Sequence, residues 1–521
     1  MLFNSYTFIL LFLPIAAGGF YLCAPRSHEL AALWLATTSL FFYAWWNPKI
    51  VLLLCASIVF NFLLGRIISA RRDSANGKTL LTLAIAANLA LLVYYKYVNF
   101  FITTSNAIVG TGFELTDIIL PLGISFFTFT QIAFLVDTYR GLASEYRFIH
   151  YVLFVTYFPH LIAGPILHHR QIMPQFGNPA IYRFDADRIA VGLTIFGIGL
   201  AKKVLIADRL APYANGIFET AQNGGLVTLF EAWIGALAYT FQLYFDFSGY
   251  SDMAIGASCM FGVSLPLNFN SPYKARNITE FWRCWHMTLS EFLRNYLYIP
   301  LGGNKLGPLR RYVNLMATMI LGGLWHGASW TFVAWGALHG VYLVINHAWQ
   351  AVMPPPTAAS PSGFAQANFF SVGLTFFAVV LAWVLFRAES FAGATIIYKG
   401  MLGFGGISLP PYVPEKFGAI AAWLQRLGVT FNGIAPVTNF SMRSVCGLLA
   451  VSTLICFALP NTQQFMHRYM PGQDNEPKAG RIALLHLEWR PTLAWSSVFA
   501  LLCGVSFLGL TQATHFLYFQ F

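Results

Sequence analysis

Long apolar runs separated by short polar or basic segments form the main pattern of this sequence. A membrane-spanning helix requires roughly 20 mostly apolar residues, and about 13 segments approach that length. The first is Leu2–Leu22, which Pro14 interrupts. The others are Leu30–Trp46, Ile50–Ser69, Leu80–Val98, Ile118–Val136, Tyr151–Ile166, Ile189–Ile206, Leu226–Tyr244, Tyr312–Leu324, Trp330–Ala348, Phe369–Phe386, Val445–Leu459 and Leu493–Leu510. Because several are short, the pattern predicts an all-α integral membrane protein with about 11–13 transmembrane or re-entrant helices.

Polar loops interrupt this pattern near residues 350–366, 388–442 and 461–491. The second loop contains Glu415–Leu427, whose apolar residues predict a short amphipathic helix. The sequence has no fixed-period repeat and no soluble catalytic domain. We therefore expect residues 1–521 to form a single polytopic membrane domain, with any chemistry in the membrane or in these loops.

The composition supports the membrane interpretation. Hydrophobic residues make up 57% of the 521 residues and charged residues only 10%, whereas soluble domains contain about 25% charged residues. A soluble chain of this kind would expose large apolar patches, and a disordered chain would be poor in apolar residues. The net charge of +11 fits basic cytoplasmic loops under the positive-inside rule. The first basic residue, Arg26, follows the first apolar run, so we expect a membrane segment with its N-terminus outside the cytoplasm rather than a signal peptide.

An ionisable residue at apolar depth is a functional-site hypothesis by default. Asp246 and Asp252 lie in Tyr244–Asn270, directly after an apolar span, among glycines and serines. We expect these small residues to relax the helix and let its backbone line a cavity, with both carboxylates in contact with substrate. The alternative is a helix-breaking turn at the interface with solvated carboxylates.

The segment Asn277–Pro300 predicts a helix capped by Asn277 or Thr279. At 100° per residue, four polar residues share one face within about 80° of arc: Arg283, His286, Ser290 and Arg294. Such a face suits an anionic ligand, for example the phosphates of coenzyme A, because guanidinium groups match phosphate oxygens. The alternative is an interfacial helix that contacts lipid headgroups.

The segment Leu321–Trp335 places His326 among glycines, with Trp325 beside it. Glycines allow close approach by a substrate, and an imidazole can take up and return a proton near neutral pH. The alternative is a hydrogen-bonded core histidine, which is how we interpret His339 and His347. The doublet His168–His169 is a weaker candidate for headgroup contacts.

Other chemistries lack their sequence signals. The chain has no GxSxG, Walker A or HExxH sequence. It has no Cys/His spacing suited to zinc, so no metal site is predicted. Histidines without an obvious serine or cysteine nucleophile favour direct, base-assisted transfer over a covalent enzyme intermediate.

Five segments together resemble the membrane-bound O-acyltransferase superfamily, in particular its bacterial alginate O-acetyltransferase branch. They are PLGISFFTF (Pro121–Phe129), FPHLIAGPI (Phe158–Ile166), FDFSGYSDMAIG (Phe245–Gly256), EFWRCWHMTLSEFLRNYLYIPLGG (Glu280–Gly303) and GLWHGASW (Gly323–Trp330). The resemblance implies a ring of helices around a tunnel that crosses a thinned membrane. It also implies that His326 is catalytic and that His286 assists or lines the channel. Cys284 departs from the family pattern, since many relatives have a second basic residue there.

The same resemblance implies acetyl transfer from cytoplasmic acetyl-CoA, with no permanently bound cofactor. Arg283 and Arg294 would hold the donor's phosphates, and Ser290, Trp325, Asp246 and Asp252 are further candidates for substrate binding. Expected partners are a periplasmic SGNH hydrolase-like protein and an exopolysaccharide or its synthase, with no nucleic acid. The expected location is the bacterial inner membrane.

Two other classes remain open. A transporter or flippase of an acyl donor or glycan would use the same intramembrane polar residues without making a bond. A scaffold for a polysaccharide synthase would need neither His286 nor His326. The acceptor also stays open among alginate, cellulose, peptidoglycan and other polymers, and the direct acceptor is either the glycan or a serine of the partner.

Overall fold

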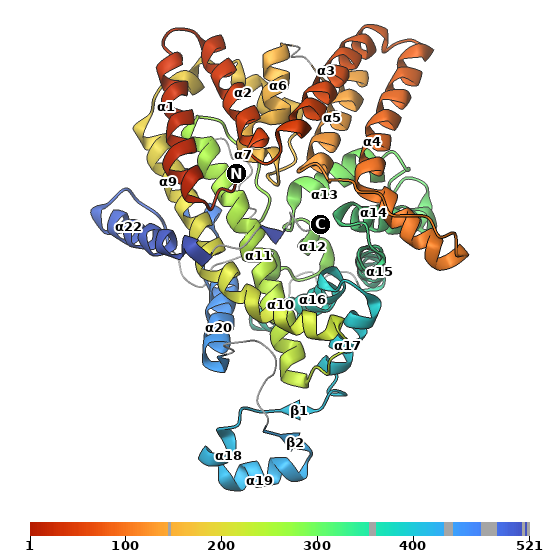
Figure 1. Ribbon diagram of the computed structural model, residues 1–521, viewed down its shortest axis with the longest axis vertical. Helices are drawn as coiled ribbons and strands as arrows, with labels where there is room; N and C mark the ends of the chain where they lie inside the picture. Colours follow the sequence, from red (N-terminus) through yellow and green to blue (C-terminus); the bar gives the residue numbers. More distant parts are fainter. Residues whose placement is uncertain (144–146, 354–360, 432–440, 470–486, 513–515, 518–521) are drawn as a thin grey trace.

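The computed structural model is built almost entirely of helices (Figure 1). It describes residues 1–143, 147–353, 361–431, 441–469, 487–512 and 516–517, without the side chains of 361–368, 511 and 512. Parts of the three predicted polar loops, at 354–360, 432–440 and 470–486, lie outside the described residues. The all-α membrane fold predicted from the sequence is confirmed.

The N-terminal region contains helices with exposed apolar side chains, as the apolar pattern predicted. Its elements are η1 (Phe8–Phe12), α1 (Leu13–Cys23), α2 (His28–Ala44), α3 (Pro48–Arg71) and α4 (Ala75–Val109). Side-chain oxygens of Ser27, Asn47 and Ser74 accept backbone N–H groups at the starts of α2, α3 and α4. The interruption expected at Pro14 is a π-helical turn, η1, immediately before α1, as proline removes a backbone donor and crowds the preceding turn.

The next region consists of shorter, buried helices. They are α5 (Ile124–Tyr139), α6 (Phe148–Thr156), α7 (Phe158–Leu161), α8 (His169–Phe176) and η2 (Pro179–Tyr182). The predicted span Tyr151–Ile166 is therefore not one helix. Tyr157 is extended (ψ 111°) and separates α6 from α7, which has Pro159 in its first turn.

Two long helical segments, packed against each other, form the centre of the bundle. They are the run α9 (Ala186–Ala201), η3 (Lys202–Ala207) and α10 (Asp208–Gln222), and the helix α11 (Leu229–Met260). A Cβ on Gly249 would lie 2.7 Å from the carbonyl oxygen of Gly199, and one on Gly256 would lie 2.5 Å from that of Gly192. The relaxed helix expected after Tyr244 is thus wrong, because these α11 glycines let α9 approach an unbroken helix.

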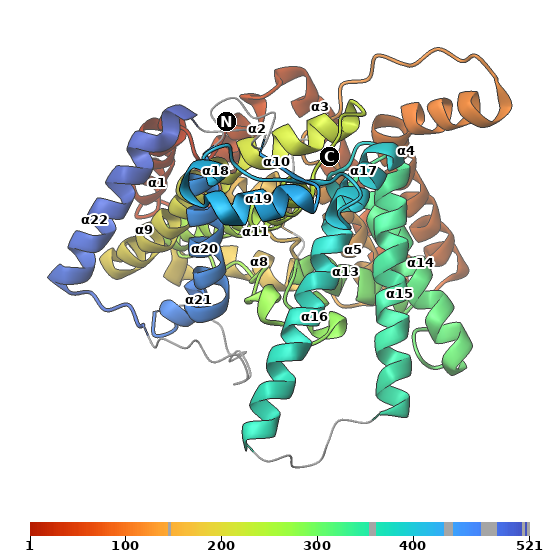
Figure 2. The same ribbon diagram turned by 90° about the horizontal axis from the view of Figure 1, so that it is seen from below.

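A hairpin of two helices follows and carries the predicted site. Its elements are η4 (Pro272–Lys274), α12 (Ile278–Trp282), α13 (Met287–Leu293), η5 (Arg294–Tyr298), α14 (Gly307–His326) and α15 (Trp330–Val352). α14 and α15 pack closely, since a Cβ on Gly323 would lie 3.0 Å from the Cα of Gly336. Figure 2 shows α15 beside α16 (Pro361–Arg387), both extending below the bundle.

The C-terminal region adds a small module with two short strands and two further apolar helices. Its remaining elements are α17 (Phe391–Met401), β1 (Ile407–Ser408), α18 (Val413–Lys416), α19 (Gly418–Arg426), β2 (Val429–Thr430), α20 (Met442–Ala458), α21 (Thr462–Phe465), α22 (Leu493–Leu508) and η6 (Gly509–Gln512). β1 and β2 pair in parallel, with Ile407 opposite Val429. The amphipathic helix predicted at Glu415–Leu427 is present as α18 and α19, interrupted at Phe417.

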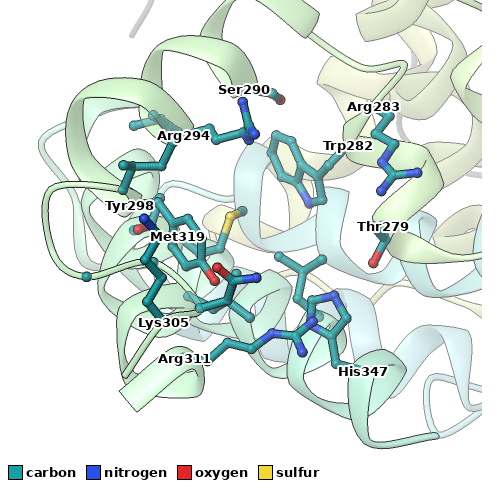
Figure 3. Close-up of a pocket in the computed structure, with 18 of the residues that line it drawn as sticks. Thr279, Trp282, Arg283, Ser290, Arg294, Tyr298, Lys305, Arg311, Met319 and His347 are labelled. Carbon is teal, nitrogen blue, oxygen red and sulfur yellow. The ribbon is translucent and has the colours of Figure 1, made fainter. Parts of the chain in front are cut away.

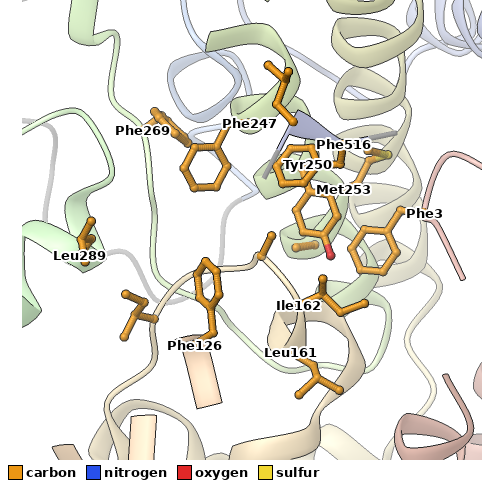
Figure 4. Packing of buried hydrophobic residues seen from close by; sticks show 14 of the residues in the cluster. Phe3, Phe126, Leu161, Ile162, Phe247, Tyr250, Met253, Phe269, Leu289 and Phe516 are labelled. Atoms are coloured by element: carbon orange, nitrogen blue, oxygen red, sulfur yellow. The ribbon is translucent and has the colours of Figure 1, made fainter. Parts of the chain in front are cut away.

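Described residues near both ends of the sequence lie inside the bundle. Phe516 stacks on Tyr250 with ring centroids 4.6 Å apart, and Phe3 stacks on the same ring at 4.7 Å (Figure 4). The backbone N–H of Leu517 donates to the carboxylate of Asp246 at 3.0 Å. Both ends of the chain therefore contribute to the aromatic core around α11.

Within the described residues, four helical segments are long and apolar enough to cross a membrane. They are Pro48–Arg71, Ala75–Val109, Ala186–Gln222 and Phe369–Arg387. Three shorter apolar helices also occur: Phe8–Cys23, Met442–Ala458 and Leu493–Leu508. Other predicted spans are broken, shorter or less apolar, and α14 carries Arg310 and Arg311. The total of 11–13 spanning or re-entrant helices, estimated from roughly 20 residues per span, stays a prediction.

Candidate functional site

The predicted helix over Asn277–Pro300 is broken at the position of His286. Asn277 caps α12 as expected, accepting the N–H of Glu280 at 2.9 Å. The helix then stops because the preceding loop takes over two of its hydrogen-bonding groups. The N–H of Asn270 donates to the carbonyl of Cys284, and the N–H of Met287 donates to the carbonyl of Asn268. His286 is left with a left-handed backbone (φ 42°), a strained conformation for a residue with a Cβ.

The side chain of His286 is held by the same loop. It is fully buried, and its Nδ1 lies 3.0 Å from Oδ1 of Asn268, which also accepts the Thr288 hydroxyl at 2.9 Å. Because an amide oxygen only accepts hydrogen bonds, this contact places the proton of a neutral imidazole on Nδ1. The Nε2 atom of that tautomer carries a lone pair.

His326 is the last residue of α14 and is 4% exposed. Its ring meets Trp335 and Phe386 edge-on, with ring centroids 5.2 Å away in both cases. A Cβ on Gly327 would collide with the ring of Phe332, so the residue after His326 has to be small. The hairpin α14–α15 therefore encloses the imidazole in an aromatic wall.

The two predicted histidines lie next to each other although 40 positions separate 286 from 326. Their ring centroids are 6.4 Å apart, with Trp325 in contact with both rings. The edge of Phe247 on α11 meets the His286 ring at 4.8 Å. Two imidazoles in a water-poor aromatic setting can act on one hydroxyl or carbonyl group between them.

A cavity of about 730 Å³ lies between α12, α13, η5, α14 and α15 (Figure 3), a size typical of small-molecule sites. Four cations line it and define what we call the basic pocket: Arg283, Arg294, Lys305 and Arg311. Among the described residues, the structure shows no ion-pair partner for any of them. Apolar and aromatic side chains, such as Trp282 and Met319, form most of the remaining wall.

One helix, α14, connects the basic pocket with His326. Arg311 lies in the second turn of α14, Met319 lies in its middle, and His326 ends it. At 1.5 Å per residue, Arg311 and His326 are about 22 Å apart along the axis. A long ligand could thus place an anionic group among the cations and a reactive group near the imidazoles.

The predicted site residues divide into three groups. Arg283, Ser290 and Arg294 all line the basic pocket, although they lie directly after α12, in α13 and in η5 rather than on one helix face. Trp325 lies beside the histidine pair, 4% exposed. Asp246 and Asp252 lie elsewhere.

Asp246 and Asp252 form what we call the ion-pair cluster with two lysines of η3. Lys203 Nζ lies 2.5 Å from the carboxylate of Asp246 and 2.8 Å from that of Asp208. Lys202 Nζ lies 2.6 Å from the carboxylate of Asp252, to which the Thr462 hydroxyl also donates at 2.7 Å. The ion pairs of Asp246 and Asp252 join η3 to α11. Neither aspartate is among the described residues that line the basic pocket. Their predicted role in substrate binding stays untested.

Several residues at the site were missed in the sequence. Lys305 and Arg311 were counted only within the basic charge assigned to cytoplasmic loops, His347 was interpreted as a core residue, and Tyr298 was not considered, yet all four line the basic pocket. Lys96 on α4 was also missed, and it donates to the carbonyls of Trp325 and His326. The available signal was its position, an ionisable side chain near the end of an apolar run.

The other candidate histidines contact neighbouring side chains of the protein. His339 accepts a hydrogen bond from Trp282 at 3.3 Å. His169 lies 3.5 Å from the buried carboxylate of Asp137, and His168 contacts the hydroxyl of Tyr296 at 3.1 Å. In the part of the chain that the structure describes, no group of three His, Cys, Asp or Glu side chains could hold a metal ion.

Comparison with known proteins gives a consistent family match. The sequence model of the membrane-bound O-acyltransferase family matches residues 41–386. A peptidoglycan O-acetyltransferase of Helicobacter pylori is 39% identical, over 100% of this chain and 98% of the relative. A probable alginate O-acetylase of Azotobacter vinelandii is also 39% identical, over 100% of both chains. A teichoic acid D-alanyltransferase of Streptococcus thermophilus is 29% identical over 44% of this chain and 57% of the relative.

Proposed function

Because the chain belongs to the membrane-bound O-acyltransferase family and is an acyl-transferring enzyme, we propose that it acetylates an extracytoplasmic polysaccharide with acetyl-CoA from the cytoplasm. The observation that carries this proposal is the basic pocket, which is lined in part by α14, the helix that ends at His326 beside the buried His286. The names of the two relatives that match along the whole chain support acetyl as the transferred group.

Coenzyme A fits the basic pocket by charge and shape. It is a polyanion with a long flexible thioester arm, and Arg283, Arg294, Lys305 and Arg311 offer cations without an ion-pair partner among the described residues, around an otherwise apolar cavity. Cationic residues favour the cytoplasmic side of a membrane. The basic end of α14 would therefore face the cytoplasm, with the N-terminus of the chain on the opposite side and the protein in the bacterial inner membrane.

The proposed reaction needs one base and no covalent enzyme intermediate. His326 takes the proton of the acceptor hydroxyl as the oxygen attacks the thioester carbonyl carbon. The tetrahedral intermediate collapses by breaking the C–S bond. The thiolate of CoA then receives the proton from the imidazolium of His326, which restores the neutral base and leaves an acetyl ester.

His286 is better suited to orient the acceptor than to hold the oxyanion. Its Nδ1 proton is engaged by Asn268, so a neutral His286 presents an acceptor at Nε2. That atom can accept a hydrogen bond from the incoming hydroxyl group. Donation to an oxyanion would first require the ring to gain a proton.

The acceptor chemistry defines the expected partner. The relatives named for peptidoglycan and alginate are equally similar to this chain, so identity does not choose between these polymers. We propose that a periplasmic SGNH hydrolase-like protein receives the acetyl group on a serine and passes it to the polysaccharide. Transport of an acyl donor or glycan without chemistry is the competing function.

Labelling of inverted membrane vesicles from the producing strain tests the proposal, since their cytoplasmic face is outside and the native acceptor stays in place. We expect added [¹⁴C]acetyl-CoA to release CoA and to yield base-labile label on polymer or protein. The variant His326→Ala should lose about 10²–10⁴-fold in rate, the contribution of a general base. His28→Ala, an exposed histidine at the start of α2, is the matched control and should retain full activity.

The location and chemical form of the label separate the alternatives. Label on a protein band that later appears in polymer supports the partner route, and label on polymer alone supports direct transfer. Intact acetyl-CoA accumulating inside the vesicles would establish a transporter. Near wild-type labelling by His326→Ala, with equal amounts of protein in the membrane, would overturn the assignment of the base.

A further inference from the structure

A lysine on a neighbouring apolar helix contacts the end of the helix that carries His326. Lys96 belongs to α4, one of the four segments apolar enough to cross a membrane. Only Lys78 and Lys96 are charged along this helix, and Lys78 lies in its first turn. An ammonium group within such a segment is costly unless it meets polar groups, so its contacts indicate what it is for.

The ammonium of Lys96 meets two consecutive carbonyl groups of α14. Its Nζ donates to the carbonyl of Trp325 at 2.6 Å and to that of His326 at 3.1 Å. The neighbouring Tyr97 donates its hydroxyl to the carbonyl of Leu324 at 2.9 Å. Two adjacent side chains of α4 thus bind three of the last four carbonyls of α14.

These contacts replace the cap that the chain itself does not provide. The last carbonyls of a helix have no intrahelical donors, and they form its negative end. Gly327, which follows His326, is extended (φ −158°) rather than left-handed, so α14 does not end in the usual glycine-based motif. Lys96 supplies both the hydrogen bonds and a positive charge at this negative end.

We infer that Lys96 is a positioning residue for acyl transfer, which fixes the orientation of His326 by holding the carbonyls of residues 325 and 326. The inference rests on the proposed role of His326 as the base. Because His326 is the terminal residue of α14, its Cα is not held by a following helical turn. Fraying of this last turn would rotate the imidazole away from His286, whose own position is fixed separately by Asn268.

The substitution Lys96→Met removes the ammonium while keeping an unbranched apolar side chain that suits a membrane helix. We expect turnover to fall about 10–100-fold, the effect of a small misplacement of a catalytic group. The KM for acetyl-CoA should stay within about 2-fold, because the cations proposed to bind the donor lie elsewhere on the chain. Lys96→Arg, which retains donors and charge, should recover most of the turnover.

Tyr97→Phe provides the matched control. It removes one hydrogen-bond donor from the same helix end, but this hydroxyl binds the carbonyl of Leu324, two residues before His326. General weakening of the helix end would lower turnover in both variants alike. Positioning of the imidazole predicts a small effect for Tyr97→Phe and a large one for Lys96→Met.

Rates in this series are expressed per molecule that binds CoA, so misfolded protein does not contribute. Equal losses in Lys96→Met and Tyr97→Phe, a raised KM with unchanged turnover, or no CoA-binding protein from Lys96→Met would each overturn the inference. His326→Ala is measured in parallel. If that variant stays active, the proposed base is wrong, whereas an inactive His326→Ala beside a fully active Lys96→Met rejects only the role of Lys96.

Discussion

Two groups of charged side chains lie within this apolar chain, and they differ in what faces each charge. In the ion-pair cluster, Lys202 and Lys203 each contact a buried carboxylate at 2.5–2.6 Å. In the basic pocket, four cations surround a cavity of about 730 Å³, and among the described residues none has an ion-pair partner. Compensated charges join helices, whereas uncompensated cations around a cavity indicate an anionic ligand.

The two groups could not be separated by residue type. Asp246 and Asp252 follow an apolar span, and Arg283 and Arg294 lie in an aromatic segment, so each set qualified as a functional candidate at apolar depth. The lysines that compensate the carboxylates come from η3, more than 40 positions earlier in the chain. A buried charge requires a partner, but the sequence does not identify which residue supplies it.

Breaking one ion pair should produce the largest change outside the buried pair His286 and His326. Lys202→Met leaves the carboxylate of Asp252 buried without its cation, and removing one partner of a buried pair costs about 3–5 kcal/mol. We expect a lower melting temperature and less extractable protein, measured by thermal unfolding in detergent. The double variant Lys202→Met with Asp252→Leu should recover much of this loss, because no charge is left uncompensated.

That recovery is the informative outcome for the comparison. If Asp252 contacts substrate rather than serving structure, the double variant would be stable but inactive. Full activity of the stabilised double variant would assign the ion-pair cluster to folding alone.

Neutralising one cation of the basic pocket should weaken substrate binding and leave the stability of the protein unchanged. Under the proposed function, Arg311→Gln removes a charge-assisted contact to acetyl-CoA, worth about 1.5–3 kcal/mol, so we expect KM for acetyl-CoA to rise about 10-fold or more. Turnover and melting temperature should change little. Steady-state kinetics at two salt concentrations measure this, since added salt weakens the attraction in the wild-type protein and less so in the variant.

Arg310→Gln is the control for this experiment, because Arg310 is adjacent on α14, exposed, and absent from the pocket lining that the structure describes. It should leave KM nearly unchanged. Equal rises in KM for both variants would mean that acetyl-CoA is attracted by the long-range electrostatic field of the basic residues and not by specific contacts in the basic pocket.

The smallest effect is expected where a neutral group supports the ion-pair cluster. Thr462 accepts a hydrogen bond from Lys202 at 2.8 Å and donates one to Asp252 at 2.7 Å. Thr462→Val should cost about 1–3 kcal/mol, the penalty of leaving a buried group less satisfied. Thermal unfolding measures the loss, and unchanged kinetics in the remaining folded protein would separate this cluster from the basic pocket. A rise in KM instead would connect the two groups functionally.

The sequence predicted much of the fold and part of the candidate site. Apolar run length located α2, α3 and α4 to within a few residues at most ends, because lipid and helix geometry together set a length that composition reveals. It failed where tertiary contacts override local periodicity. The helix expected through His286 is interrupted by hydrogen bonds with Asn268 and Asn270. The relaxed helix expected near Gly249 is instead regular, because α9 packs against it at Gly199.

The candidate site shows the same division. Arg283, Ser290 and Arg294 were predicted to share a ligand from their spacing on a helix that does not exist as one piece, yet they line one cavity. The sequence did not predict that Lys305 and Arg311 line the same cavity, or that Lys96 contacts the carbonyls of Trp325 and His326. Because these three cationic residues lie outside the segment from Arg283 to Arg294, the sequence gave no indication that they contact the site.

What the sequence by itself determined is the class of protein and the identity of its candidate chemistry. A chain with 57% hydrophobic and 10% charged residues has too few polar groups for a water-facing surface, and two histidines in glycine- and tryptophan-rich segments stand out against it. Only the tertiary structure decided which charges compensate one another and which surround a cavity. It also decided that two imidazoles 40 positions apart lie 6.4 Å from each other. Electrostatic compensation and ring contacts act through space over a few ångströms, and only the packing of the helices determines which residues come that close.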